Sequence, residues 1–168
     1  MLRSKNIAWV RERPHRNKIM AWFEDGAPCN YFGAELTPSL RAVGWLAKRK
    51  PFTTGPLDRR VHDKLQELRE GRQHARWSWL LQFMFMGRHE CDFCSGQDAA
   101  WGSMNLLIPG RGFLFVAPDL ILHYMEAHAY QPPPEFCQAV LACPPVPSTA
   151  YLEAVAANGG GVLLASGT

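Results

Sequence analysis

Two cysteines and two histidines form the clearest chemical pattern in the sequence. Cys91 and Cys94 make a C-x-x-C pair, a spacing that lets two thiolates share one tight turn whose backbone N–H groups can hydrogen-bond the sulfurs. His123 and His128 make an H-x4-H pair, which falls within the spacing of zinc-binding histidines. Two sulfurs and two nitrogens suit tetrahedral zinc. We therefore predict one structural zinc ion bound by all four residues.

Other interpretations of these residues stay open. His89 lies two residues before the cysteine pair and is the main rival ligand. A thioredoxin-like redox pair opens a helix after a buried strand, whereas this C-x-x-C follows charged residues. A thioredoxin-like role for the pair is therefore not expected. The alternative to a metal site is that the two histidines are ordinary surface residues and the two cysteines ordinary thiols. The remaining cysteines are predicted to be buried or free thiols: Cys29, Cys137 and Cys143.

The number of ligands favours a structural role over catalysis. Four protein ligands fill the tetrahedral shell of zinc, whereas a catalytic zinc keeps one position open for water. The sequence contains no H-E-x-x-H, no phosphate-binding loop, no G-x-S-x-G and no dinucleotide fingerprint. It also lacks the order of H-x-E before P-C-x-x-C that a zinc deaminase needs. We expect a protein that is not an enzyme, with an enzyme of unrecognised site as an alternative.

The predicted ligands need a helix and a hairpin to position them. A helix is expected from Pro118, with Asp119 in its first turn. Residues five apart on an ideal helix diverge by about 140°, so we expect the last turn to loosen and bring His123 and His128 together. Between the two pairs, MNLLIPGRGFLFVAP predicts a hairpin that turns at residues 109–112. This order resembles an enlarged ββα zinc finger. Because 28 residues separate Cys94 from His123, a DNA-reading finger is not expected.

The other segments predict further helices and strands. One helix is expected from Pro56 to Glu70, ended by Gly71, with an apolar face made by Leu57, Val61, Leu65 and Leu68. Strands are expected at residues 19–23 and 40–46 and in the second half of residues 76–86. Two more helices are expected, from Pro133 or Pro134 to Ala142 and from Ser148 or Thr149 to Ala157.

These elements predict an α+β fold with a small antiparallel sheet and four or five helices. We expect a single domain over residues 1–168. Within it lie a basic N-terminal part (1–50), a zinc-binding unit (87–142) and a Pro/Gly-rich extension (143–168) whose last residues suit a flexible tail. No run of eighteen apolar residues and no signal-peptide stretch occurs, so we expect a cytoplasmic protein without membrane contact.

Charge is divided unevenly along the chain. The part up to Arg111 holds all 18 basic residues and 11 of the 15 acidic ones, a net charge of +7. We favour an ordinary mixed, solvated surface, because the longest basic run is only three residues. Nucleic-acid binding is the alternative. The candidate contacts are Lys48, Arg49, Lys50, Arg11, Arg13 and Arg16, with Arg3, Lys5 and Lys18 nearby in sequence.

Three segments resemble an uncharacterised family of small bacterial zinc-finger-like proteins. They are VGWLAKRKPFTTGPL, GRHECDFC and APDLILHYMEAHAYQPPPEFCQAVL, and the resemblance covers residues 43–141. The family shares a GWL segment, an H-x-C-x-x-C knuckle and an HY-x-x-x-H-x-Y-x-PP-x-EF block. The resemblance implies zinc binding and a bacterial, cytoplasmic origin. We expect a zinc-stabilised protein-interaction or regulatory module with a protein partner, with nucleic-acid binding as the alternative.

Overall fold

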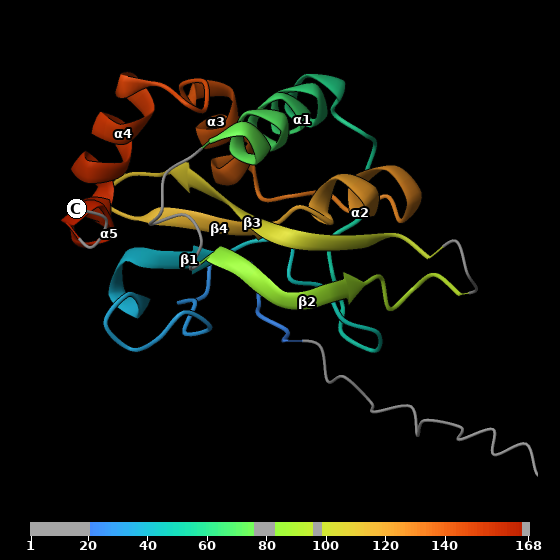
Figure 1. The fold of residues 1–168 in the computed structure, drawn as a ribbon. Helices are drawn as coiled ribbons and strands as arrows, with labels where there is room; N and C mark the ends of the chain where they lie inside the picture. The colour runs from blue at the N-terminus through green and yellow to red at the C-terminus, as the bar shows by residue number, and fades with distance from the viewer. Residues whose placement is uncertain (1–20, 76–82, 96–98, 166–168) are drawn as a thin grey trace, which may run out of the picture.

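The computed structural model describes residues 21–75, 83–95 and 99–165, which form an α+β fold as predicted. In Figure 1 the helices α1, α2, α3 and α4 lie on one side of a four-stranded sheet. The strands are β1 (Leu40–Ala42), β2 (Met84–Glu90), β3 (Trp101–Pro109) and β4 (Leu114–Pro118). The α-helices are α1 (Arg59–His74), α2 (Ile121–Ala127), α3 (Pro134–Ala142), α4 (Thr149–Val155) and α5 (Gly161–Ala165).

The sheet has the order β1-β4-β3-β2 and is mixed. β3 and β4 form the predicted hairpin, whose turn is closed by the Gly110 amide donating to the Phe113 carbonyl at 2.8 Å. β1, however, pairs with β4 in parallel, Leu40 opposite Leu114. The prediction of an antiparallel sheet was therefore wrong for β1. A parallel pair needs a long crossover, and here α1, β2 and β3 all intervene in the sequence.

β1 is shorter than the predicted strand at residues 40–46. Gly44 has a left-handed φ of 73°, and its amide donates to the Asp25 carboxylate at 2.9 Å instead of continuing a sheet ladder. A Cβ at this glycine would lie 3.0 Å from the Ile121 side chain, so the turn needs glycine for two reasons. The strand predicted at 19–23 is also absent over 21–23, where Phe23 makes one long amide contact to Trp45; residues 19 and 20 lie outside the described chain.

The start of α1 is set by Asp58 and not by proline. The Asp58 carboxylate accepts from the Arg60 amide at 3.0 Å and from the Val61 amide at 3.3 Å, which satisfies two free donors of the first turn. The helix predicted to begin at Pro56 therefore begins at Arg59. Leu57, which was predicted to be buried, precedes the helix and is only half-buried.

The apolar face of α1 is as predicted, but its end is not. Val61, Leu65 and Leu68 are buried. Gly71 lies inside the helix, which continues to His74. A Cβ at Gly71 would overlap the Val146 carbonyl oxygen, so this glycine serves the close approach of the proline-rich segment and does not end the helix.

The C-terminal segment packs against the rest of the molecule. α3 has the predicted bounds, and the Ser148 hydroxyl caps α4 by accepting from the Tyr151 amide at 3.1 Å. α4 ends at Val155 instead of Ala157, and after a kink at Gly159 the chain continues as α5. Leu163 on α5 is buried. The flexible tail predicted here is therefore wrong for residues 161–165, while residues 166–168 lie outside the described chain.

The core lies between the helices and the central strands. All five residues of β4, which pairs with β1 on one edge and with β3 on the other, are buried. None of the helices in the described parts of the chain is both long and apolar enough to cross a lipid bilayer.

Candidate metal centre

The cysteine pair lies on a tight turn that follows β2 directly. Cys91 is buried, and its backbone N–H donates to the Ala100 carbonyl at 2.8 Å, which holds the turn against the start of β3. The backbone amides of Phe93 and Cys94 hydrogen-bond the Cys91 sulfur. These contacts match the predicted turn, in which main-chain N–H groups stabilise a thiolate.

One histidine lies on the short helix α2 and the other directly follows it. His123 lies on α2, whereas His128 is the residue that caps it, with φ −122° and ψ 11°. The following Ala129 has a left-handed φ of 51°. Pro118 does not start the helix, which begins at Ile121. The last turn has loosened as predicted, and the two Nε2 atoms lie 3.1 Å apart.

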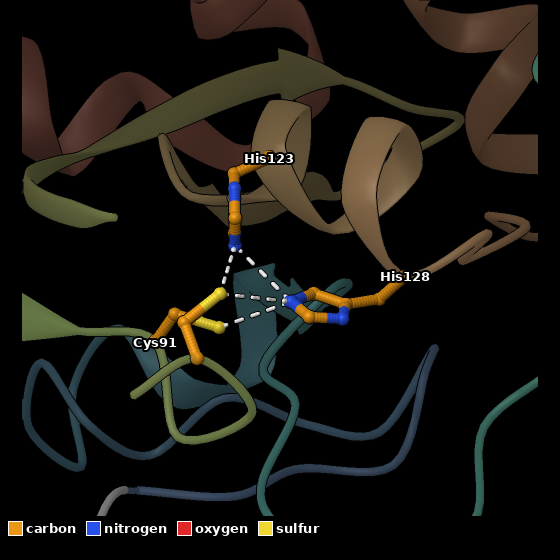
Figure 2. Close-up of side chains that lie close together, drawn as sticks. Cys91, His123 and His128 are labelled. Atoms are coloured by element: carbon orange, nitrogen blue, oxygen red, sulfur yellow. Dashed lines mark hydrogen bonds between the residues drawn. The ribbon is translucent and has the colours of Figure 1, made fainter. Parts of the chain in front are cut away.

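The two pairs converge on one point, as Figure 2 shows for Cys91, His123 and His128. The Cys91 Sγ lies 3.3 Å from the His128 Nε2, and the Cys94 Sγ lies 3.3 Å and 3.5 Å from the Nε2 atoms of His123 and His128. All four donor atoms lie within 4.8 Å of one another. Tetrahedral zinc, with bonds of about 2.0–2.3 Å, separates its ligand atoms by roughly 3.3–3.8 Å. Four of the six separations between the donor atoms, 3.1–3.5 Å, lie at or just below the short end of this range, so the arrangement suits one such ion.

Burial shifts the pKa values of His123 and Cys91 in opposite directions. Burial lowers the pKa of His123, the neighbouring His128 lowers it further, and Glu126 opposes both. The neutral imidazole is the form that binds a metal. Burial also raises the pKa of the Cys91 thiol, against the backbone amides of Phe93 and Cys94. A cation at the centre would offset this rise by stabilising the thiolate.

Aromatic rings pack against one side of the cluster. Phe93, which lies between the two cysteines in sequence, has its ring centroid 5.1 Å from that of His128 and 6.0 Å from that of Tyr124. Phe52 packs edge-on against Phe93 at 5.5 Å. The His128 ring therefore packs against an aromatic cluster that also includes Tyr124 of α2.

The rival ligand and the other thiols lie outside this cluster. His89 is on β2 opposite Gly102, and it is not among the metal-ligating groups within 4.8 Å of one another. Cys29 and Cys143 are buried free thiols, and Cys137 is a half-buried one, in agreement with the prediction. Burial raises the pKa of Cys143 to about 12, so it stays protonated at neutral pH.

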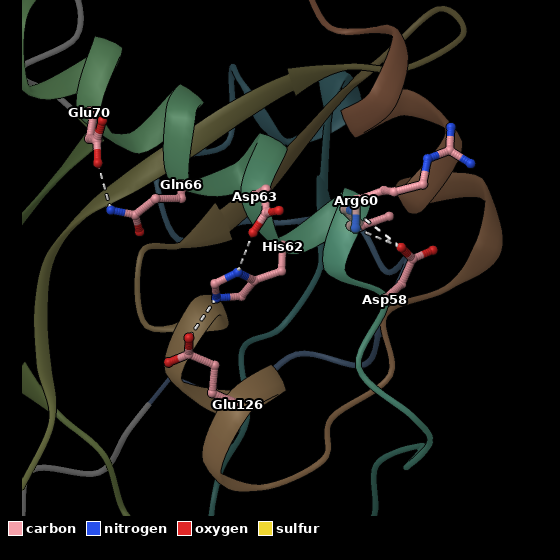
Figure 3. Close-up of polar contacts among 8 residues, drawn as sticks. Asp58, Arg60, His62, Asp63, Gln66, Glu70 and Glu126 are labelled. Carbon is pink, nitrogen blue, oxygen red and sulfur yellow. Dashed lines mark hydrogen bonds and ion pairs between the residues drawn. The ribbon is translucent and has the colours of Figure 1, made fainter.

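A polar cavity beside the cluster was not predicted from the sequence. It has a volume of about 600 Å³ and lies between α1 and α2, with His123 and Arg69 among its lining residues. His62 on α1 contacts Glu126 on α2 at 2.9 Å, as Figure 3 shows. The sequence contains only a weak signal for this cavity. Glu126 lies three residues after His123, but nothing in the sequence places α1 against the helix that carries them.

The predicted nucleic-acid contacts are only partly described. Lys48, Arg49 and Lys50 are exposed on one turn, where Arg49 has a left-handed φ of 74°. The Lys50 ammonium lies 4.3 Å from the centroid of the Trp22 ring. Three further candidates, Arg11, Arg13 and Arg16, lie outside the described residues, as do Arg3, Lys5 and Lys18.

A half-buried carboxylate at the start of the described chain was also not predicted. Asp25 accepts from the Gly44 amide and from the Tyr130 hydroxyl, both at 2.9 Å. Burial raises the pKa of Asp25 above its usual value, and the two hydrogen bonds only partly oppose this rise. The folded protein therefore holds this proton more tightly than the unfolded chain does.

This raised pKa gives a testable pH dependence. Because the folded state binds the Asp25 proton more tightly, stability from this group is greatest below the unfolded pKa and is lost as pH rises through the folded pKa. Asp25→Asn keeps an oxygen for Gly44 and removes the charge. Relative to wild type, the variant should become more stable as the pH rises from about 4 to 7. Urea unfolding of both proteins across this range measures the difference, and a constant or falling difference contradicts the prediction.

Comparison with known protein families places the four clustered residues within a described domain. A family model described as a domain of unknown function (DUF7919) matches residues 21–141. This range includes all four residues of the cluster and the segments from β1 to α3. Searches among curated proteins and among solved structures gave no significant match.

Proposed function

We propose that this chain, which belongs to the DUF7919 family of domains of unknown function, is a protein-interaction or regulatory module stabilised by one structural zinc ion. The observation that carries the proposal is the convergence of Cys91, Cys94, His123 and His128, with all donor atoms within 4.8 Å. Two thiolates and two imidazoles are a common donor set of structural zinc sites. The partner that fits the family resemblance is a protein of a bacterial cytoplasm.

The donor set favours a structural ion over a catalytic one. Four protein ligands complete a tetrahedral shell and leave no position for water or substrate. Zinc would tie the turn after β2 to the short helix α2 and its C-cap, two segments that lie far apart in the sequence. Its binding energy would then become folding energy. On these grounds we propose a module without catalytic activity.

Elemental analysis of protein purified without added metal tests the proposal. We expect one zinc per chain in wild type, and a loss of zinc from both Cys91→Ser and His128→Ala. Two matched controls lie outside the cluster: Cys137→Ser and His89→Ala should keep the metal. Wild-type protein free of zinc and of any substitute metal would overturn the proposal. If His89→Ala lost its zinc and His128→Ala kept it, His89 would take the place of His128 as a ligand.

Nucleic-acid binding remains the second candidate, and one observation favours it. Lys48, Arg49 and Lys50 are all exposed on a single turn, and the Trp22 ring lies directly beneath the Lys50 ammonium. Cations beside an aromatic ring suit single-stranded nucleic acid, where phosphates meet the charges and bases stack on rings.

The salt dependence of binding tests this second candidate. A labelled single-stranded oligonucleotide should bind with an affinity that falls steeply as salt rises, because bound cations displace counterions from phosphates. Replacing Lys48, Arg49 and Lys50 together by alanine should reduce the slope of log K against log salt by about 2. Fluorescence anisotropy at increasing potassium chloride measures both slopes. No binding at low salt, or a flat salt response, removes this candidate.

A further inference from the structure

Two of the cysteines are placed to react with each other, although both are free thiols in the structure. Cys91 and Cys94 lie on one turn, their side chains hydrogen-bond each other, and their sulfurs lie within 4.8 Å. The remaining thiols contact backbone groups instead of a second sulfur: Cys29, Cys137 and Cys143. The pair in the metal centre is therefore the one suited to form a disulfide.

The two sulfurs of the pair differ in their access to solvent. Cys94 is partly exposed, whereas Cys91 is only 3% exposed. The Cys91 sulfur is also held in place by the backbone amides of Phe93 and Cys94. A small oxidant from solvent would therefore meet Cys94 first, and Cys91 is the resolving thiol beside it.

The turn and α2 depend on the metal centre to different extents. The turn has its own support on β3, because the Cys91 amide donates to the Ala100 carbonyl at 2.8 Å. On the other side, His128 is followed by Ala129, whose left-handed φ of 51° is costly for a residue other than glycine. Loss of the bond to His128 should therefore loosen the chain after α2 more than it loosens the turn.

We propose that the metal centre is a redox-sensitive switch, in which hydrogen peroxide joins Cys91 and Cys94 in a disulfide and releases the zinc ion. This inference rests on the proposed function, because it names how the zinc-stabilised module is regulated. It differs from thioredoxin-like exchange, since the pair is oxidised once per switching event and does not pass electrons to a substrate protein.

The oxidation proceeds in two steps that involve only these thiolates and peroxide. The Cys94 thiolate attacks one peroxide oxygen, the O–O bond breaks, and hydroxide leaves, so that Cys94 becomes a sulfenic acid. The Cys91 thiolate then attacks the Cys94 sulfur, forms the S–S bond and displaces a second hydroxide. The two sulfurs together lose two electrons, peroxide gains them, and both hydroxides take a proton from solvent to become water. A disulfide carries no charge, so only the two imidazoles still bind the ion, too weakly to retain it.

Counting of thiols in the full-length, zinc-containing protein tests the chemistry. Trypsin cuts after Arg88 and Arg111, which leaves Cys91 and Cys94 in one peptide and the other cysteines in different ones. After excess hydrogen peroxide, this peptide should resist labelling by iodoacetamide until dithiothreitol is added. A colorimetric chelator should detect one released zinc per disulfide formed, and dithiothreitol with added zinc should restore the bound metal.

A thiol variant and two adverse results complete this test. Cys137→Ser is the matched control, because its sulfur lies outside the cluster and the variant keeps the reactive pair. It should release zinc at the wild-type rate, and a release slower by roughly tenfold would overturn the inference. Zinc that stays bound under peroxide, or zinc released while both thiols of the pair still accept the label, overturns it too.

Amide signals in two-dimensional NMR spectra distinguish a local switch from general unfolding. The Gly55 amide donates to the Ala129 carbonyl, so its signal and that of Gln131 should move when the disulfide forms. The Val43 amide, which donates to the Val116 carbonyl of β4, is the matched control and should keep its position. Collapse of all these signals into the range of an unfolded chain, or no change at Gly55 and Gln131, overturns the inference.

Zinc content measured before oxidation separates this inference from the proposed function. Protein purified without any metal contradicts the proposed function, and the switch then has no ion to release. Protein with one zinc per chain that keeps both its metal and its two thiols under peroxide contradicts the switch alone.

Discussion

Replacing Cys94 by serine should remove the metal and lower the melting temperature by about 10 °C or more. Cys94 is half-exposed, so the substitution disturbs packing less than it would at the buried Cys91. The expected size of this shift follows because the binding energy of the metal contributes to the free energy of folding. A loss of about 4 kcal/mol lowers the melting temperature of a protein this large by about 8–16 °C. Differential scanning calorimetry and elemental analysis of the same sample measure the two effects together.

A thiol outside the cluster provides the matched control. Cys137 is half-buried, and its sulfur contacts the Pro132 carbonyl at 3.6 Å, an acceptor that a serine hydroxyl also suits. Cys137→Ser should keep the zinc and change the melting temperature by only a few degrees. A strong chelator should lower the melting temperature of wild type to that of Cys94→Ser, and should have no further effect on the variant. An unchanged melting temperature after complete removal of the metal would contradict a structural role.

Replacing Trp45 by alanine should destabilise the protein by about 3–5 kcal/mol. Trp45 is 2% exposed, and its indole N–H donates to the Val116 carbonyl of β4 at 3.0 Å. Its ring also packs edge-on against Phe23 at 5.3 Å and against Phe32 at 6.2 Å. The substitution would remove the residue that joins the N-terminal segment to the central strand. The free energy of unfolding in urea measures the loss.

Two comparisons separate the parts of this effect. Trp45→Phe keeps most of the apolar contact and removes the indole donor, while the Val116 carbonyl still accepts from the Val43 amide at 3.1 Å, so we expect a smaller loss of about 1–2 kcal/mol. Trp101→Ala, on the half-exposed ring of β3, should cost less than Trp45→Ala. The zinc content should be normal in Trp45→Phe, because Trp45 is not one of the four predicted ligands. A loss in Trp45→Ala no larger than that in Trp101→Ala would contradict the packing role.

The sequence was sufficient to identify the four members of the cluster, because each pair is local. In C-x-x-C the two thiols share one turn, and in H-x4-H the two imidazoles share one short helix and its C-cap, so spacing alone restricts where the side chains can lie. The hairpin was equally predictable. Residues 109–112 contain the Pro-Gly and Gly signals that reverse a strand, and the flanking runs are apolar.

Competing local signals explain the errors at the ends of the elements. Pro56 and Asp58 both suit a helix start, and only the observed bonds to the Arg60 and Val61 amides show that Asp58 is the cap. A glycine such as Gly71 is typical of a helix end. Its actual role depends on Val146, which lies 75 residues away in the sequence, so no local pattern contains it.

Only the tertiary structure determined which distant segments meet. The parallel pairing of β1 with β4 and the contact of His62 with Glu126 both depend on long-range packing. Residue spacing constrains neighbours along the chain through backbone geometry, whereas segments separated by tens of residues are brought together by the burial of apolar surface, which is not directional. The sequence therefore determined which side chains can bind a metal, and the packing of α2 against the turn after β2 brought them within reach of one ion.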